Sequence, residues 1–294
     1  MRHVAFLTMD SLEAFVAYDH LAVAPLRARG WDVTDVPWRA DVDWSRFEAV
    51  VIRTPWDYQD APEDFLAVLE AIEASGARLA NDLRAVRWNL TKTYLREMEA
   101  AGVTIVPTTW GERLTPEALD GLFRQHGSEI VIKPIVGANA DNAFRLTPEA
   151  DASGALRTFA AKRFMAQPFV RSVVERGEFS LFFFHGAYSH AILKTPAPRD
   201  FRVQEEHGGT IRAIQPEPSL LEAADRALAA APEELLYARP DFVRMPDGTW
   251  ALMELEIIEP SLYFPYDAAS PERFAEAFVR WVDRPLAPEA ASGG

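Results

Sequence analysis

The chain is 294 residues long, which at about 100 to 200 residues per domain predicts two or three lobes rather than one simple core. Hydrophobic residues make up 49% and charged residues 25%, values typical of folded globular proteins, so disordered and fibrous classes are excluded. A net charge of -14 disfavours nucleic acid and anionic membranes as partners, and the lack of cysteine excludes disulfides and thiolate metal sites. No apolar run reaches the length of a membrane span, so we expect a cytoplasmic protein.

The first 90 residues alternate short apolar runs with amphipathic stretches. We expect strands at His3–Met9, Asp32–Pro37 and Ala49–Arg53, and helices at Tyr18–Arg29 and Pro62–Ser75. This is the β-α-β order of a small parallel sheet, in which ligands bind beyond the carboxyl ends of the strands. A first lobe formed by residues 1–90 is therefore expected to hold the substrate.

One segment at a predicted strand end offers the groups of an amino acid pocket. Arg53 suits a carboxylate, Asp57 suits an ammonium group, and Trp56 and Tyr58 provide two aromatic walls. The alternative is structural, with the two aromatic side chains packing the lobe interface. A second candidate pair follows the first strand: Asp10 and Ser11.

The rest of the chain divides into two further predicted lobes, residues 91–167 and 168–284, followed by a mobile tail at 285–294. The middle lobe is expected to contain helices at Thr91–Ala101 and Thr115–Gln125, a strand at Glu129–Pro134, a further strand, and a helix around Glu149–Ala160. After Phe164 strands dominate. The expected elements are the paired strands Gly177–His185 and Ala187–Lys194, a helix at Leu220–Ala230, the paired strands Tyr237–Met245 and Trp250–Ile258, and a helix at Pro271–Arg284.

The second of these hairpins concentrates carboxylates. Because side chains alternate along a strand, Glu254 and Glu256 are expected to share a face with Leu252 and the other even-numbered apolar residues. Folding back across the turn brings Asp241 level with Met253 or Glu254. Three carboxylates in apolar surroundings repel one another unless a hard cation is bound, which favours Mg²⁺ over the alternative of an exposed acidic sheet edge.

Nearly all of the positive charge is arginine, and the only lysines are Lys92, Lys133, Lys162 and Lys194. Lys133 ends an apolar strand beside the small-residue loop 137–142, where its ammonium group suits a nucleotide phosphate. Lys162 is interpreted as a surface residue. Arg202, near a glycine pair, suits charge on a carboxylate or acyl phosphate, and a surface ion pair is the alternative.

The order of the motifs resembles the ATP-grasp superfamily. The matching motifs are Lys92 before a helix, Val131-Ile132-Lys133-Pro134 before a small-residue loop, Gln167-Pro168-Phe169-Val170, Asp200-Phe201-Arg202, and Glu254-Leu255-Glu256. Within the superfamily the chain is similar to the branch of glutathione synthetase and the ribosomal-protein glutamate ligases. Three further segments resemble the cyclo-ligases that close the D-cycloserine ring: Gly177–Ser180, Ser189–Pro196 and Glu254–Ser261.

This resemblance implies an α+β fold with three lobes, an α/β N-terminal lobe, and the nucleotide between the central and C-terminal lobes. It implies roles at the ATP site for Lys92, Lys133, the backbone of Gln167, Phe169 and Val170, and also Glu178 and Lys194. It further implies that Asp241, Glu254 and Glu256 bind Mg²⁺ and that Arg202 stabilises an acyl phosphate. The superfamily more often has asparagine where this chain has Glu256. A homodimer is implied by the resemblance alone.

The function expected from these features is ATP-dependent ligation of a carboxylate to an amine. Transfer of the γ-phosphoryl group to the carboxylate gives an acyl phosphate, which an amine attacks with release of phosphate. The substrate is expected to be a small amino-acid-like molecule, and the cyclo-ligase likeness favours ring closure within an O-ureidoserine-like molecule. The alternative is an ATP-binding regulatory or scaffold module without ligase activity. A periplasmic amino acid binding protein is disfavoured because the sequence begins without an evident secretory signal.

Overall fold

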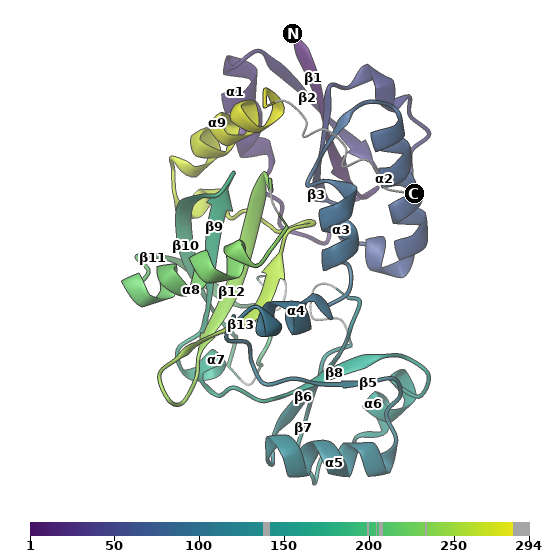
Figure 1. Ribbon diagram of the computed structural model, residues 1–294, viewed down its shortest axis with the longest axis vertical. Coiled ribbons are helices and arrows are strands. Elements are labelled where there is room, and N and C mark those ends of the chain that lie inside the picture. The colour runs from purple at the N-terminus through teal and green to yellow at the C-terminus, as the bar shows by residue number, and fades with distance from the viewer. Residues whose placement is uncertain (138–141, 199, 204, 206–207, 233, 285–294) are drawn as a thin grey trace.

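The computed structural model describes residues 1–137, 142–198, 200–203, 205, 208–232 and 234–284. The described chain forms three sheets that follow one another along the long axis of the molecule (Figure 1). The mixture of one parallel and two antiparallel sheets with covering helices makes this an α+β fold, as expected. The tail at 285–294 and most of the loop after Lys133 lie outside the described residues.

The first sheet is parallel and has the order β2-β1-β3-β4. Its strands are β1 (Arg2–Thr8), β2 (Trp31–Pro37), β3 (Ala49–Thr54) and β4 (Arg78–Ala80), and its helices are α1 (His20–Ala28), α2 (Pro62–Ala74) and α3 (Leu83–Asn89). The three predicted strands and two predicted helices are confirmed. Neither β4 nor α3 was predicted, because each is too short for a periodic pattern to stand out.

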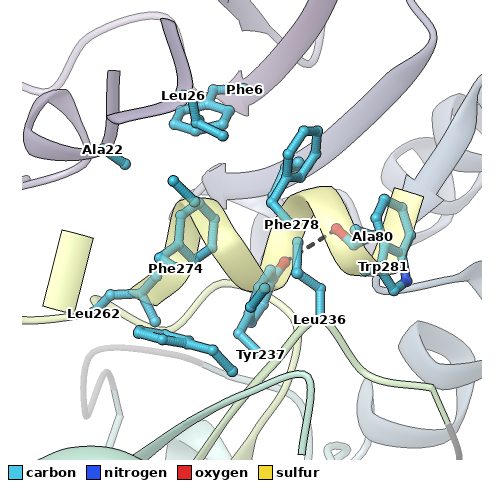
Figure 2. Packing of buried hydrophobic residues seen from close by; sticks show 14 of the residues in the cluster. Phe6, Ala22, Leu26, Ala80, Leu236, Tyr237, Leu262, Phe274, Phe278 and Trp281 are labelled. Atoms are coloured by element: carbon cyan, nitrogen blue, oxygen red, sulfur yellow. Dashed lines mark hydrogen bonds between the residues drawn. The ribbon is translucent and has the colours of Figure 1, made fainter. Parts of the chain in front are cut away.

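The two faces of this sheet belong to different cores. Val4 and Phe6 pack against α1 and the last helix, α9 (Ser270–Val282), whereas Ala5 and Leu7 pack against α2. Strand alternation explains this division. Figure 2 shows that side chains of α9 lie between Phe6 of the first sheet and Tyr237 of the large sheet. The last helix is therefore part of the first layer, although it belongs to the third lobe by sequence; the boundaries at residues 90 and 167 stay predictions.

The large sheet has five antiparallel strands in the order β11-β10-β9-β12-β13. They are β9 (Glu178–Phe184), β10 (Ala187–Thr195), β11 (Thr210–Ile214), β12 (Tyr237–Arg244) and β13 (Trp250–Glu256), with the helices α7 (Ser172–Glu175) and α8 (Pro218–Ala229) beside them. Both predicted hairpins are confirmed. In the second, Asp241 pairs with Glu254, one of the two registers that the sequence allowed.

The third sheet has the order β5-β8-β6-β7 and is antiparallel. Its strands are β5 (Thr109–Gly111), β6 (Ile130–Pro134), β7 (Phe144–Leu146) and β8 (Phe164–Pro168), with α5 (Pro116–His126) and α6 (Ser153–Thr158) packed on it. Helix α4 (Tyr94–Ala100) links it to the first sheet and is shorter than predicted. No helix in the described ranges combines the length and the apolar character that a membrane crossing requires.

A β-bulge in the second hairpin corrects the predicted faces. The pairing shifts by one residue between Asp241 and Phe242, because Phe242 pairs with Leu252 rather than with Met253. Leu252 consequently packs in the apolar core, while Met253 lines the same cavity as Glu254. The expectation that Leu252 shares a face with Glu254 was wrong, since one extra residue reverses the alternation.

The β9–β10 hairpin contains two glycines that allow a controlled test of steric fit. Both have left-handed φ angles, +100° at Gly177 and +78° at Gly186. A Cβ atom added at Gly177 would lie 2.6 Å from the backbone oxygen of Lys194, whereas nothing lies within 4 Å at Gly186. We expect Gly186→Ala to lower the free energy of unfolding by about 1–2 kcal/mol through backbone strain alone. Gly177→Ala is expected to lower it further, because β10 must also move; equal losses in urea unfolding would contradict this.

Candidate active site

A cavity of about 200 Å³ lies where the three sheets approach one another. Strands β6, β8, β9, β10, β12 and β13 all contribute to its lining, together with the loops after β3 and β13. Among the described residues, five acidic and five basic side chains line it. They are Glu178, Asp241, Glu254, Glu256 and Glu259, and Lys92, Lys133, Lys194, Arg202 and Arg239.

Asp241 lies at the centre of the charged network. The Lys194 ammonium group is 3.3 Å from its carboxylate, and the Arg239 guanidinium group is 3.0 Å away. Lys194 also pairs with Glu178 at 2.5 Å. Burial alone would raise the pKa of Asp241, but the charges of Arg239 and Lys194 hold it below its ordinary value. Asp241 is therefore an ionised carboxylate inside the protein.

The two glutamates of β13 are held in the same way. Glu254 forms an ion pair with Lys92, and Glu256 forms one with Arg239, which lies opposite it on β12. Burial opposes ionisation at both, yet Lys92 and Lys133 keep the pKa of Glu254 below its ordinary value. At Glu256 burial prevails and raises the pKa to about 7. The two neighbours thus differ in how readily they ionise.

The predicted metal ligands fit Mg²⁺ in their chemistry, although each is paired with a cation here. Asp241, Glu254 and Glu256 offer only oxygen atoms, as hard divalent cations prefer. Within the described ranges no three histidine, aspartate or glutamate side chains are grouped closely enough to hold a metal ion by themselves. Because acidic and basic residues balance in the cavity, a bound triphosphate would leave unneutralised negative charge. A magnesium ion shared by the phosphates and these carboxylates would supply the missing positive charge.

Lys133 is placed to meet an anionic ligand. It lies near the end of β6 and lines the cavity, and burial lowers its pKa. In contrast to Lys92 and Lys194, its ammonium group forms no ion pair with any described residue. The structure thus brings Lys92, Lys133 and Lys194 to one cavity but leaves only Lys133 without a carboxylate in contact among those residues.

Replacing Lys133 with methionine is expected to weaken ATP binding about 10- to 100-fold. A hydrogen bond to a charged group contributes about 1.5–3 kcal/mol, and methionine keeps the apolar stem while removing the charge. The dissociation constant should be measured by calorimetry. Lys162→Met makes the same change at an exposed site and should leave the constant unaltered. Equal affinity of the Lys133→Met and unaltered proteins would remove Lys133 from the nucleotide site.

The segment predicted to contact adenine forms an apolar wall of the cavity. Gln167, Phe169 and Val170 all line it. The Gln167 side-chain amide donates to Thr108 Oγ1 at 2.9 Å, so this side chain is fixed. Phe169 meets Phe201 edge-on, with ring centroids 6.4 Å apart. The apolar side chains of Phe169 and Val170 suit a nucleobase.

Arg202 lines the cavity and is anchored by its neighbour Asp200. Arg202 Nη2 donates to an Asp200 carboxylate oxygen at 2.8 Å, and the backbone amides of Phe201 and Arg202 donate to the other at 2.7 and 3.0 Å. Hydrogen bonds from Arg202 hold the pKa of Asp200 well below its usual range. The arginine is thus oriented by the local backbone turn.

The predicted amino acid pocket divides into two halves. Trp56 and Tyr58 line the cavity, whereas Arg53 and Asp57 do not. Arg53 and Asp57 lie outside the cavity lining, so the structure does not bring the four predicted residues together, and a substrate-binding role for these two stays a prediction. Asp10 and Ser11 are exposed and also lie outside the cavity lining.

Arg53 and Asp57 are each held by partners within the protein. Arg53 is 1% exposed within β3 and donates to Asp19 at 2.5 Å and to the Pro260 carbonyl oxygen at 2.8 Å. Asp57 accepts from Trp38 Nε1 at 2.7 Å and pairs with Arg39. The spacing of hydrophobic residues along the sequence does not indicate these partners.

Sequence reasoning missed two charged residues of the cavity, Arg239 and Glu259. Arg239 precedes Asp241 by two positions in β12, so strand alternation places both on one face and provided a signal. Glu259 follows Glu256 by three positions, beyond the end of β13. No periodic pattern extends that far.

Comparison with known proteins places this chain in a family. Residues 4–81 match the family model of the N-terminal domain of D-cycloserine synthetase DcsG. The cycloserine biosynthesis protein DcsG of Streptomyces lavendulae is 35% identical over 256 residues, which cover 81% of this chain and 84% of that protein. The chain belongs to the DcsG family of ATP-grasp ligases. The predictions of an ATP-grasp fold and of a ligase akin to the D-cycloserine-forming enzymes are confirmed.

Solved structures agree with membership of the DcsG family. The crystal structure of D-cycloserine synthetase DcsG has a TM-score of 0.81 at 30% identity and covers 95% of this chain and 99% of that one. The fold is shared with the ATP-grasp ligase PsnB complexed with minimal precursor, Mg and ADP. That match has a TM-score of 0.66 at 17% identity and covers 96% of this chain and 98% of that one. It is also shared with the D-alanine–D-alanine ligase of Bacillus anthracis complexed with ATP. That match has a TM-score of 0.68 at 14% identity and covers 96% of this chain and 97% of that one.

Proposed function

We propose that this member of the DcsG family uses ATP to activate the carboxylate of a small amino-acid-derived substrate and closes a ring with an internal nitrogen, releasing ADP and phosphate. The observation that carries the proposal is the composition of one cavity. Lys133, Arg202 and three carboxylates face the same space as Trp56 and Tyr58 of the first lobe. Groups suited to a triphosphate and groups suited to a small organic molecule thus meet at one point.

Different residues of the cavity serve different parts of the reaction. Lys133 binds the phosphates, and the wall formed by Phe169 and Val170 holds the base. Asp241, Glu254 and Glu256 would hold Mg²⁺, which neutralises phosphate charge when bound. Arg202 stabilises negative charge on the acyl phosphate and on the oxygen atom of the tetrahedral intermediate that follows. The substrate nitrogen attacks the acyl carbon and loses its proton to solvent, and the phosphate departs with the electron pair of the bond that breaks.

The test is ADP release by the purified protein with ATP, Mg²⁺ and O-ureido-D-serine, with the products identified by mass spectrometry. We expect ADP release that depends on this compound and the appearance of a cyclic product. O-ureido-L-serine and D-serine serve as comparison substrates. Tight ATP binding without turnover on any of the three would favour a nucleotide-binding regulatory module instead. A cytoplasmic location and a homodimer stay predictions.

A further inference from the structure

Glu259 occupies the side of the cavity where the first lobe meets the large sheet. It lies just beyond β13 and lines the cavity together with Glu256, Trp56 and Tyr58. The reaction assigned above uses Asp241, Glu254 and Glu256 but gives no role to this fourth carboxylate near the end of β13. It lies beside the aromatic pair of the first lobe, where the proposed function places the substrate.

The backbone around Glu259 is fixed by side chains from two lobes. Trp56 Nε1 donates to the Glu259 carbonyl oxygen at 2.9 Å, and Arg53 Nη2 donates to the Pro260 carbonyl oxygen at 2.8 Å. From the large sheet, Arg239 Nη1 donates to the Ser261 carbonyl oxygen at 3.2 Å. Three successive carbonyl groups are therefore held. A segment pinned in this way presents its side chain in one direction, as a binding site requires.

The Tyr58 hydroxyl group, also from the first lobe, lines the cavity beside Glu259 and favours the ionised form of its carboxylate. Burial, reinforced by the charge of Glu256, raises the pKa of Glu259 to about 8.

Glu259 also differs from the other cavity carboxylates in its charge partners. Glu178, Asp241, Glu254 and Glu256 each form an ion pair with a lysine or arginine. For Glu259 the structure shows no such pair with any residue in the ranges it describes. A half-buried carboxylate such as that of Glu259 is stabilised by a positive charge. Because the described protein supplies none in contact, a cationic group of the ligand would complete the site.

We propose that Glu259 is a specificity-determining residue that binds the α-ammonium group of the substrate, with Trp56 fixing the backbone that presents its carboxylate. This inference rests on the proposed function. In an α-amino acid the ammonium and carboxylate groups share one carbon atom, so the residue that binds the first must lie beside the groups that activate the second. Glu259 meets this condition, because it lines the cavity next to Glu256 but on the side of the first lobe.

The test compares two substrates in the same variants. One is O-ureido-D-serine, and the other is the analogue in which a hydroxyl group replaces its α-amino group. We expect Glu259→Gln to lower kcat/KM for the amino substrate at least 100-fold and for the hydroxy analogue less than threefold, with no change in the KM for ATP. Glu259→Asp, which keeps the charge, should retain preference for the amino substrate. Glu149→Gln, at an exposed position, is the matched control and should match the unaltered protein on both substrates.

An equal loss on both substrates, or no loss on either, would overturn the role of Glu259. Failure of the proposed function is recognised separately, as absence of ADP release by the unaltered protein. In that case calorimetry on the nucleotide-loaded protein replaces kinetics. Binding of O-ureido-D-serine that is lost in Glu259→Gln but kept in Glu149→Gln would support the ammonium site. Binding that is equal in both variants, or undetectable in the unaltered protein, would overturn it.

Discussion

Replacing Arg239 with methionine is expected to lower the free energy of unfolding by about 3–5 kcal/mol, the cost of removing one partner from a buried ion pair. Arg239 is 6% exposed and contacts the carboxylates of Asp241 and Glu256. Methionine fills much of the same space but leaves Glu256 without its cation and Asp241 with Lys194 alone. The change should be measured by urea unfolding monitored by tryptophan fluorescence.

The control for this prediction is an exposed arginine pair. Arg163 lies 3.2 Å from Glu112, and the two side chains are 49% and 79% exposed. Arg163→Met is expected to cost less than about 1 kcal/mol, because solvent screens such a pair. If the two variants lose the same free energy, the buried network does not stabilise the fold. The free energy of unfolding that Arg239→Met loses beyond the loss in Arg163→Met measures the contribution of burial to the ion pairs of Arg239.

The hairpin that holds the carboxylates shows what local sequence can determine. Its two strands were predictable because apolar residues flank a Pro-Asp-Gly turn, and folding about that turn brings Asp241 level with Met253 or Glu254 without deciding between them. The bulge was not predictable, since no glycine or proline marks it in the strand around Met253. It decides which face Leu252 occupies, and only packing against α4 reveals it.

The substrate side of the cavity was harder to predict for a different reason. Arg53 and Asp57 carry the charges that an amino acid needs, and composition alone cannot show that Asp19, Pro260 and Trp38 already bind them. Glu259 presents the opposite case. Its proposed role depends on a contact with Trp56, about 200 residues earlier in the chain, and no local pattern encodes a contact at that separation.

Replacing Glu254 with glutamine is expected to lower the rate of ADP release about 10²- to 10³-fold, the usual effect of removing one preorganised electrostatic group from a reacting centre. Glutamine has the same shape but carries no charge, so it is a weaker ligand for Mg²⁺ and a weaker partner for Lys92. The Mg²⁺ concentration that gives half-maximal rate should rise as well. Glu222→Gln, on the exposed face of α8, is the matched control and should change neither quantity.

These two roles of Glu254 can be separated by a third variant. If Glu254 acts only by holding Lys92, then Lys92→Met should reproduce the whole loss of rate without altering the Mg²⁺ dependence. If Glu254 also binds the metal ion, only Glu254→Gln should shift the Mg²⁺ dependence, because Lys92 offers no oxygen ligand. A Glu254→Gln protein that folds, keeps its rate and needs no additional Mg²⁺ would remove Glu254 from the metal site. The ion pair seen between Lys92 and Glu254 would then be structural, like that of Arg53 with Asp19.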